Sequence, residues 1–113
     1  MSEFTYLFRG RKTSGSPEEM QQHFEQWAAW FKELGAAGRM KDRGRPLQST
    51  GKLVSGRQKV VTDGPYAEAK DVVGGYITVE ADDLAQAVEL SKGCPILEVG
   101  GSVEVRPVQR LNM

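Results

Sequence analysis

A strand that ends in an Asp-Gly-Pro turn constrains the fold of this chain more than any other feature. Residues 60–62 read Val-Val-Thr, and such β-branched residues favour extended backbone. Gly64 tolerates backbone angles that other residues avoid, and Pro65 disfavours the helical region for the residue before it. A second apolar run opens with Gly-Gly-Tyr at 74–76. The stretch therefore predicts two strands joined by a loop, with Asp63 at a strand end, where folds often present functional side chains.

Length and charge limit the class of protein. The 113 residues fit one domain, spanning 1–113, which is long enough to bury a core without disulfides or metals. Fifteen basic residues balance fifteen acidic ones, which argues against nucleic acid or a membrane as the main partner. A local basic cluster is interpreted as a solvated loop because no aromatic residues interleave with it: Arg39, Lys41, Arg43 and Arg45.

The few cysteine and histidine residues limit the chemistry. Cys94 is the only cysteine, so no intramolecular disulfide can form, and one Cys with one His cannot assemble a zinc site at any usual spacing. Cys94 precedes Pro95 and is expected at a buried helix end, not as a nucleophile. No motif calls for nicotinamide, flavin or haem, so no cofactor is expected. The absence of a signal-like start and of an apolar span favours the cytoplasm.

The periodicity of apolar residues predicts a strand and then a long helix. Aromatic residues at every second position from Phe4 predict a strand through Arg9. Ser16, Pro17 and Glu19 have the pattern of a capping box with proline at the first helical position. The helix is expected to end near Gly35 or Gly38, and its apolar stripe is formed by Met20, Phe24, Trp27, Phe31 and Leu34.

The remaining pattern completes an α+β fold. We expect a turn at 42–44, strands near 45–50, 53–54, 57–62 and 75–80, a second helix capped by Asp82, and a last strand over 102–109. This order predicts an antiparallel sheet with both helices on one face, which is a ferredoxin-like β-α-β-β-α-β unit with extra hairpin strands. Because the other face of the sheet is left uncovered, a homodimer that closes two sheets face to face is expected.

Several motifs, taken in order, resemble the YCII-related family and in particular its DGPF-domain branch. The resemblance covers nearly the whole chain, and its most specific parts are Val-Thr-Asp-Gly-Pro-Tyr-Ala-Glu at 61–68 and the ending at 103–108. One departure is Tyr66, which stands where the branch has phenylalanine. The added hydroxyl leaves a similar ring, so its packing role is expected to survive.

The resemblance implies a dimeric α/β barrel of the ferredoxin-like type with a His-Asp pair in a cleft. The matching positions here are His23 and Asp63. Most members of the family have no assigned reaction, but one related branch contains a dehydrochlorinase, so acid-base lyase chemistry is within reach of the fold. DGPF members are also often encoded beside extracytoplasmic-function sigma factors, which implies a regulatory or stress context.

The two candidate catalytic residues each have a structural alternative. His23 is the only histidine, and on a helical wheel it lies about 50° from the centre of the apolar stripe. It can serve as a general acid or base near neutral pH, or it can be a boundary histidine with a satisfied hydrogen bond. Asp63 can orient the imidazole, or it can simply cap the turn that follows it.

Four further residues are candidates for ligand binding. Tyr66, Glu68 and Lys70 alternate along the loop and can line the mouth of a cleft, although Glu68 and Lys70 are equally explained as solvated or paired surface charges. Ser102 follows two glycines and can offer a hydroxyl and amides to an anion, or it can simply begin a strand.

Two functions are therefore expected from the sequence. The first is a cofactor-independent acid-base enzyme, of lyase or isomerase type, that uses His23 and Asp63 on a small organic acid. The second is a non-catalytic ligand-binding or accessory protein linked to sigma-factor or stress regulation, which uses the same cleft or its dimer surface.

Overall fold

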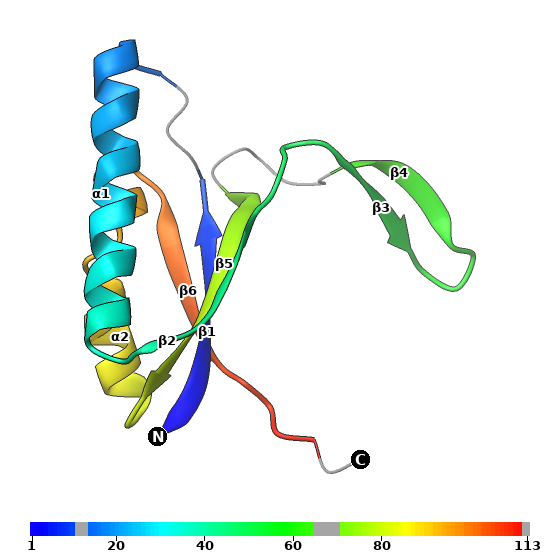
Figure 1. Ribbon diagram of the computed structural model, residues 1–113. Helices are drawn as coiled ribbons and strands as arrows, with labels where there is room; N and C mark the ends of the chain where they lie inside the picture. Colours follow the sequence, from blue (N-terminus) through cyan, green and yellow to red (C-terminus); the bar gives the residue numbers. More distant parts are fainter. Residues whose placement is uncertain (11–13, 65–70, 112–113) are drawn as a thin grey trace.

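The computed structural model describes residues 1–10, 14–64 and 71–111, in which helices cover one face of a sheet and a separate hairpin projects from it (Figure 1). No helix of this described part is both long and apolar enough to cross a membrane. In chain order the elements are β1 (Ser2–Arg9), α1 (Pro17–Ala36), β2 (Met40–Pro46), β3 (Gly51–Ser55), β4 (Val60–Gly64), β5 (Val73–Ala81), α2 (Leu84–Ser91), the 3₁₀ helix η2 (Pro95–Val99) and β6 (Ser102–Pro107).

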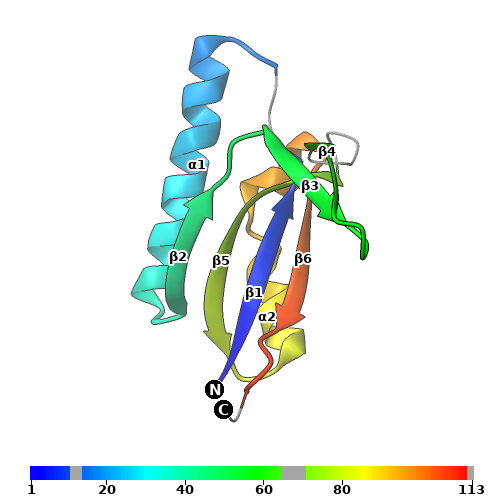
Figure 2. The same ribbon diagram turned by 90° about the vertical axis from the view of Figure 1, so that its right-hand side faces the viewer.

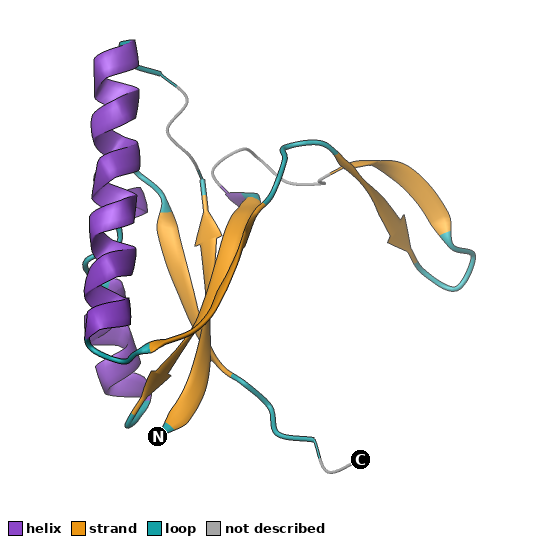
Figure 3. Ribbon diagram, viewed as in Figure 1, coloured by secondary structure: helices purple, strands orange, loops and turns teal. Residues whose placement is uncertain are grey.

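The main sheet confirms the predicted ferredoxin-like topology. Its strand order is β2-β5-β1-β6, and every neighbouring pair is antiparallel (Figure 2). Without the β3–β4 hairpin, the order along the chain is β-α-β-β-α-β. Both helices lie on the same face of the sheet, so the opposite face is left open (Figure 3).

The core lies between the sheet and the helices. Tyr6 of β1 is fully buried and stacks on Trp30 of α1, with ring centroids 6.1 Å apart. The Tyr6 hydroxyl donates a hydrogen bond to the carbonyl oxygen of Ala87 in α2 at 2.5 Å, so this buried polar group is satisfied. On β5, Ile77 and Val79 are buried against the helices, as the predicted alternation of that strand requires.

Helix α1 begins as the sequence predicts. The Ser16 side chain accepts from the Glu19 backbone amide at 3.1 Å, and the Glu19 carboxylate accepts from the Ser16 amide at 3.4 Å, which completes the capping box. Pro17 occupies the first helical position. The helix ends at Ala36, and Gly38 follows with a left-handed φ of +71°, so the predicted end is also confirmed.

The N-terminal part of the apolar stripe on α1 is not core. Trp30 and Leu34 are buried, whereas Met20 is 40% exposed and Phe24 is 67% exposed. Figures 1 and 2 show that the first turns of α1 reach beyond the end of β1. No sheet lies beneath these turns, so an apolar stripe of correct helical spacing has nothing to pack against there.

Two predicted boundaries are wrong. The segment 42–44 is not a turn between elements, because β2 spans Met40–Pro46 and pairs with β5 through an irregular register. Gly44 has φ +55° within this strand, which is why a strand interior looks like a turn in the sequence. Helix α2 is capped by Asp83, not Asp82: the Asp83 carboxylate accepts from the Gln86 amide at 2.8 Å.

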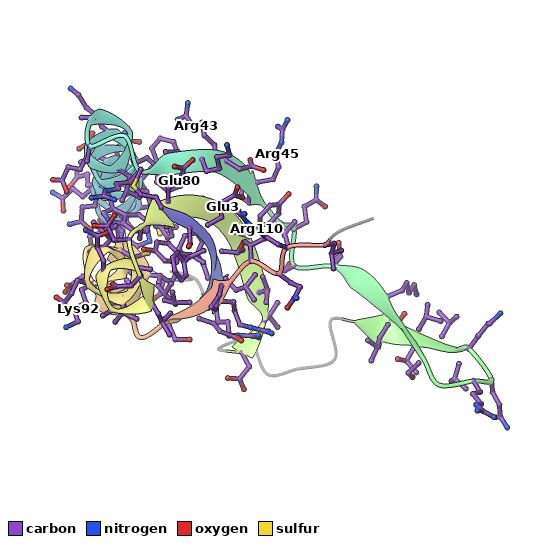
Figure 4. The ribbon with its side chains drawn as sticks, turned by 90° about the horizontal axis from the view of Figure 1, so that it is seen from below. Glu3, Arg43, Arg45, Glu80, Lys92 and Arg110 are labelled. Atoms are coloured by element: carbon purple, nitrogen blue, oxygen red, sulfur yellow. The ribbon has the colours of Figure 1, made fainter. Side chains whose placement is uncertain are left out.

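The hairpin formed by β3 and β4, here called the arm, stands apart from the main sheet. Two strands were predicted in this region, and the structure pairs them with each other only, Lys52 opposite Asp63 and Val54 opposite Val61. Figures 1 and 4 show the arm projecting on the side of the sheet away from the helices. The expectation of extra hairpin strands is thus met by a separate two-stranded sheet.

Candidate functional site

A cleft of about 460 Å³ lies between α1 and the β2–β5 edge of the sheet. This volume is typical of small-molecule sites, as is a mainly apolar lining with a few polar groups. The polar residues of the lining are His23, Arg43, Arg45 and Tyr76. The apolar wall includes Phe8, Met20, Phe24, Trp27, Phe31 and Ile96.

The overhang of α1 creates this cleft. Met20 and Phe24 are exposed because the sheet does not reach them, and both line the cleft. Side chains at the N-terminal end of the predicted stripe therefore form one wall of the candidate site. The pattern correctly identified a continuous apolar stripe, but it could not show where the sheet beneath the stripe ends.

His23 lies on the cleft wall with a defined hydrogen-bond partner. The indole Nε1–H of Trp27 donates to His23 Nε2 at 3.0 Å, and the two residues are one helical turn apart on α1. Nε2 must carry a lone pair to accept this bond, so the neutral ring holds its proton on Nδ1. His23 is intermediate in exposure, as the helical-wheel position predicted.

Trp27 is itself held by aromatic contacts on the other side of its ring. Its ring meets Phe8 edge-on at a centroid distance of 4.9 Å. It also contacts Trp30 at 5.9 Å and Phe31 at 5.8 Å. Edge-to-face aromatic pairs of this kind stabilise a fixed ring orientation. The indole N–H is therefore held in position toward His23 by the core of the protein.

Arg43 and Arg45 bring positive charge to the opposite side of the cleft. Both come from the edge strand β2, beside α1, as Figure 4 shows. Gly44 between them has a left-handed φ of +55°, and a Cβ at this position would collide with the carbonyl oxygen of Tyr76. Within the described residues neither guanidinium has a carboxylate partner. Two such cations beside an apolar cavity are suited to an organic anion.

The interpretation of the basic cluster as a solvated loop is wrong about the loop, because Lys41, Arg43 and Arg45 belong to strand β2. Arg43 and Arg45 also line the cleft, although both residues are exposed. The sequence concealed this strand because Gly44, between the two arginines, is typical of a turn, and the irregular register of β2 breaks the alternation that identifies a strand.

The structure does not bring His23 and Asp63 together within one chain. Asp63 lies in β4 of the arm, its side chain is 91% exposed, and it forms an ion pair with Lys52 on the neighbouring strand. Figures 1 and 2 show the arm and α1 well separated. Of the other candidates, Ser102 is exposed at the start of β6 and does not line the cleft, while Tyr66, Glu68 and Lys70 fall outside the described residues.

Two buried titratable residues, Tyr6 and Cys94, do not line the cleft. Burial raises the pKa of Tyr6 and that of the Cys94 thiol to about 12 each. A thiol in this state is not a nucleophile near neutral pH, which agrees with the prediction that Cys94 is a buried helix-end residue. The described residues also contain no group of three or more His, Cys, Asp or Glu side chains that could hold a metal ion.

Fold and site together define a small ferredoxin-like α+β domain with a histidine and two arginines around an apolar cleft. The chain belongs to the YCII-related family, since the model of the YCII-related domain matches residues 4–112. Among solved structures it is similar to the 5-chloro-2-hydroxyhydroquinone dehydrochlorinase of Burkholderia phenoliruptrix in complex with 2,5-dihydroxybenzoquinone, with 17% sequence identity, coverage of 97% of this chain and 93% of that chain, and a TM-score of 0.46. A search of curated proteins found no match.

Proposed function

We propose that this protein is a cofactor-independent acid-base enzyme, of lyase or isomerase type, that acts on a small organic acid in the cleft. The observation that carries the proposal is the placement of His23 on the wall of an apolar cavity that also contains Arg43 and Arg45. The apolar wall favours a ligand with a hydrophobic body, and the guanidinium groups favour a carboxylate or enolate on that body.

The tautomer of His23 suits proton transfer. With Nε2 as acceptor and the proton on Nδ1, the neutral ring offers a lone pair at one position and an N–H donor at the other. A proton on a substrate carbon can move to Nε2 when the substrate replaces the Trp27 N–H there. The electron pair of the broken C–H bond stays on the substrate as an enolate, and this negative charge faces the imidazolium that forms. Transfer of this kind by a positioned histidine contributes about 10²–10⁴-fold to a reaction rate.

Binding is tested first, with benzoate as the probe because it joins an apolar ring to a carboxylate. We expect benzoate to shift the imidazole nitrogen signals of ¹⁵N-histidine-labelled protein, and Arg43→Ala with Arg45→Ala to weaken this response by at least about tenfold in Kd. Lys92→Ala is the matched control, since Lys92 is a cation on the far helix that pairs with Glu89 (Figure 4). An equal response in both variants would contradict the assignment of the two arginines.

Turnover is tested without knowledge of the substrate. An acid-base enzyme that removes a proton from carbon exchanges that proton with solvent, so candidate organic acids are incubated with the protein in D₂O and followed by mass spectrometry. We expect deuterium incorporation by the wild type and its loss in His23→Gln. Incorporation that survives in His23→Gln would remove His23 from the reaction.

The alternative is a ligand-binding or accessory protein without turnover, in the regulatory context that the resemblance to the DGPF branch implies. The separation of Asp63 from His23 favours it, because Asp63, the carboxylate that the resemblance implied for the dyad, pairs with Lys52 on the arm and not with His23 of the same chain. Benzoate binding without deuterium exchange in any acid tried would support this function over the enzyme.

We further propose a cytoplasmic homodimer in which the open faces of two sheets meet. On this face Thr5 and Thr78 are hydrogen-bonded to each other at 3.2 Å and Leu7 is half-buried, although no helix covers them. Tyr76 adds a ring that is 36% exposed. A second copy would remove these groups from water.

A further inference from the structure

The arm has more apolar surface than a free hairpin can leave in water. Val54 and Val61 face each other on one side of it and are 60% and 61% exposed. On its other side Leu53 is 38% exposed and Val60 is 51% exposed. A two-stranded hairpin by itself is marginally stable in water. The arm therefore needs a covering surface, and within the described chain neither of its strands packs extensively on a helix or on the main sheet.

The position of the arm indicates where that surface comes from. It leaves the sheet on the side away from α1 and α2, so the arm and the open face of the sheet lie on the same side of the molecule (Figures 1 and 3). A body that docks on the open face can therefore reach the arm as well. A second copy of the chain can do so reciprocally, since a twofold axis can place each arm beside the sheet of the other copy.

Charge also favours a second copy over a charged partner. The chain has a net charge of zero, so two copies do not repel each other. Arg57 and Lys59 at the tip of the arm have no carboxylate partner in the described residues. Glu3, on the open face, likewise has no cationic partner there (Figure 4). The arm thus offers positive charge to a face that carries unpaired negative charge.

We propose that the arm is an exchange element: in a homodimer each arm packs across a second copy and buries Val54 and Val61 against it. This goes beyond the sheet-to-sheet dimer proposed above and rests on it only for the open face. It makes the arm, rather than the sheet face alone, responsible for the strength of the association.

The test compares the intact chain with Val54→Asp/Val61→Asp by sedimentation at about 100 μM. Both side chains are exposed within one chain, so the double variant keeps its core, which circular dichroism checks. We expect a mass of twice 12.5 kDa for the wild type and a single 12.5 kDa chain for the variant. Leu84→Asp is the control, because Leu84 is 46% exposed but lies in α2, and it should remain dimeric.

Hydrogen exchange of the arm amides gives a second, independent readout. If each arm packs on a second copy, the amides of residues 51–55 and 60–64 exchange slowly. In the double variant the same amides exchange as fast as those of an unprotected hairpin. A dimeric double variant, or a wild-type monomer with unprotected arm amides, would overturn the proposal. Benzoate binding to the double variant is measured in the same samples. If the double variant still binds benzoate, the cleft works without the arm contact. Failure of the arm proposal can therefore be told apart from failure of the proposed function.

Discussion

At the scale of single residues, His23 accepts a hydrogen bond from the indole of Trp27, and Asp63, the carboxylate that the resemblance implied, pairs with Lys52 instead. Trp27 is four residues after His23, and helix geometry places such pairs side by side, so this contact could be inferred from the sequence. The sequence could not show that Asp63 lies on a projecting hairpin, because the position of a hairpin is decided by contacts far along the chain. The histidine of the candidate site and its neighbour on the helix were thus predictable, and the position of Asp63 was not.

The Trp27 bond should fix the tautomer of His23. We expect wild-type protein above the titration range to show the Nδ1–H form in long-range ¹H–¹⁵N spectra, and Trp27→Phe to shift the population toward Nε2–H, because phenylalanine retains a ring but has no donor. Phe31→Leu is the control: it alters packing against Trp27 and leaves the N–H in place. A wild type already in the Nε2–H form would show that the bond is absent in solution.

Phe24 and Leu34 lie on the same predicted stripe but should differ sharply in their contribution to stability. Leu34→Ala should lower the free energy of unfolding by about 2–5 kcal/mol, because Leu34 is 3% exposed in the core. Phe24→Ala should change it by less than about 1 kcal/mol, because Phe24 is 67% exposed on the cleft wall. Urea unfolding measures both. Equal losses would mean that Phe24 is covered in solution, as core or within an assembly.

At the scale of elements, features set by neighbouring residues were predicted correctly, and features set by contacts between distant segments were not. The capping box of α1 and the alternation in β5 depend on neighbouring residues, and both were predicted correctly. The strand predicted near 45–50 was displaced from β2 because Gly44, inside β2, has a backbone conformation that is typical of turns. What keeps this residue within a strand is the approach of the Tyr76 backbone on β5, which no local pattern records.

Gly44 and Gly38 form a matched pair for testing this close approach. Both have positive φ, but a Cβ at Gly38 meets nothing within 4 Å, whereas one at Gly44 meets the Tyr76 carbonyl. Gly38→Ala should therefore cost only the backbone strain, about 1–2 kcal/mol. Gly44→Ala should cost clearly more, and it should also weaken benzoate binding because Arg43 and Arg45 would shift. Thermal unfolding of the two variants decides the first point, and similar losses would contradict it.

A charge pair between β1 and β6 should make stability depend on pH. The Arg9 guanidinium donates to the Glu104 carboxylate at 2.9 Å and holds the pKa of Glu104 below its usual range. The contribution is therefore present above the unfolded pKa, about 4.3, and is lost as the pH falls through the lower folded value. We expect Glu104→Gln to be less stable than wild type at pH 7 and to match it at pH 2. A difference that persists at pH 2 would indicate packing instead of charge.

At the scale of the whole molecule, the fold class was predictable and the position of the arm was not. Apolar periodicity and capping signals gave the strand and helix order, and that order leaves few antiparallel topologies. Residues 51–64 could join the main sheet only if one of their strands paired with β5. Strand β5 pairs with β2 and β1 instead, so β3 and β4 form a separate sheet. The cleft arises in the same way, from the relative lengths of α1 and the sheet.

A His23–Asp63 pair, if the homodimer forms it, must join two copies. Labelled Asp63→Asn chains are therefore mixed with unlabelled His23→Gln chains, which keep Asp63. We expect the His23 imidazole signals of Asp63→Asn to differ from wild type and to return to wild-type positions in the mixture, because the second chain supplies the carboxylate. Signals that stay unchanged on mixing would contradict a pair between copies, and wild-type signals in Asp63→Asn alone would contradict any pair.

The place where the arm leaves the sheet bears on how such proteins diversify. Strands β2 and β5 pair directly, and the whole of residues 47–72 is inserted between them. Extending a loop that is already closed costs little additional entropy, since the cost grows only with the logarithm of its length. Evolution can therefore lengthen, trim or replace this insertion without disturbing the domain that carries the cleft. In this architecture the quaternary structure and the chemistry of the cleft can then change independently of each other.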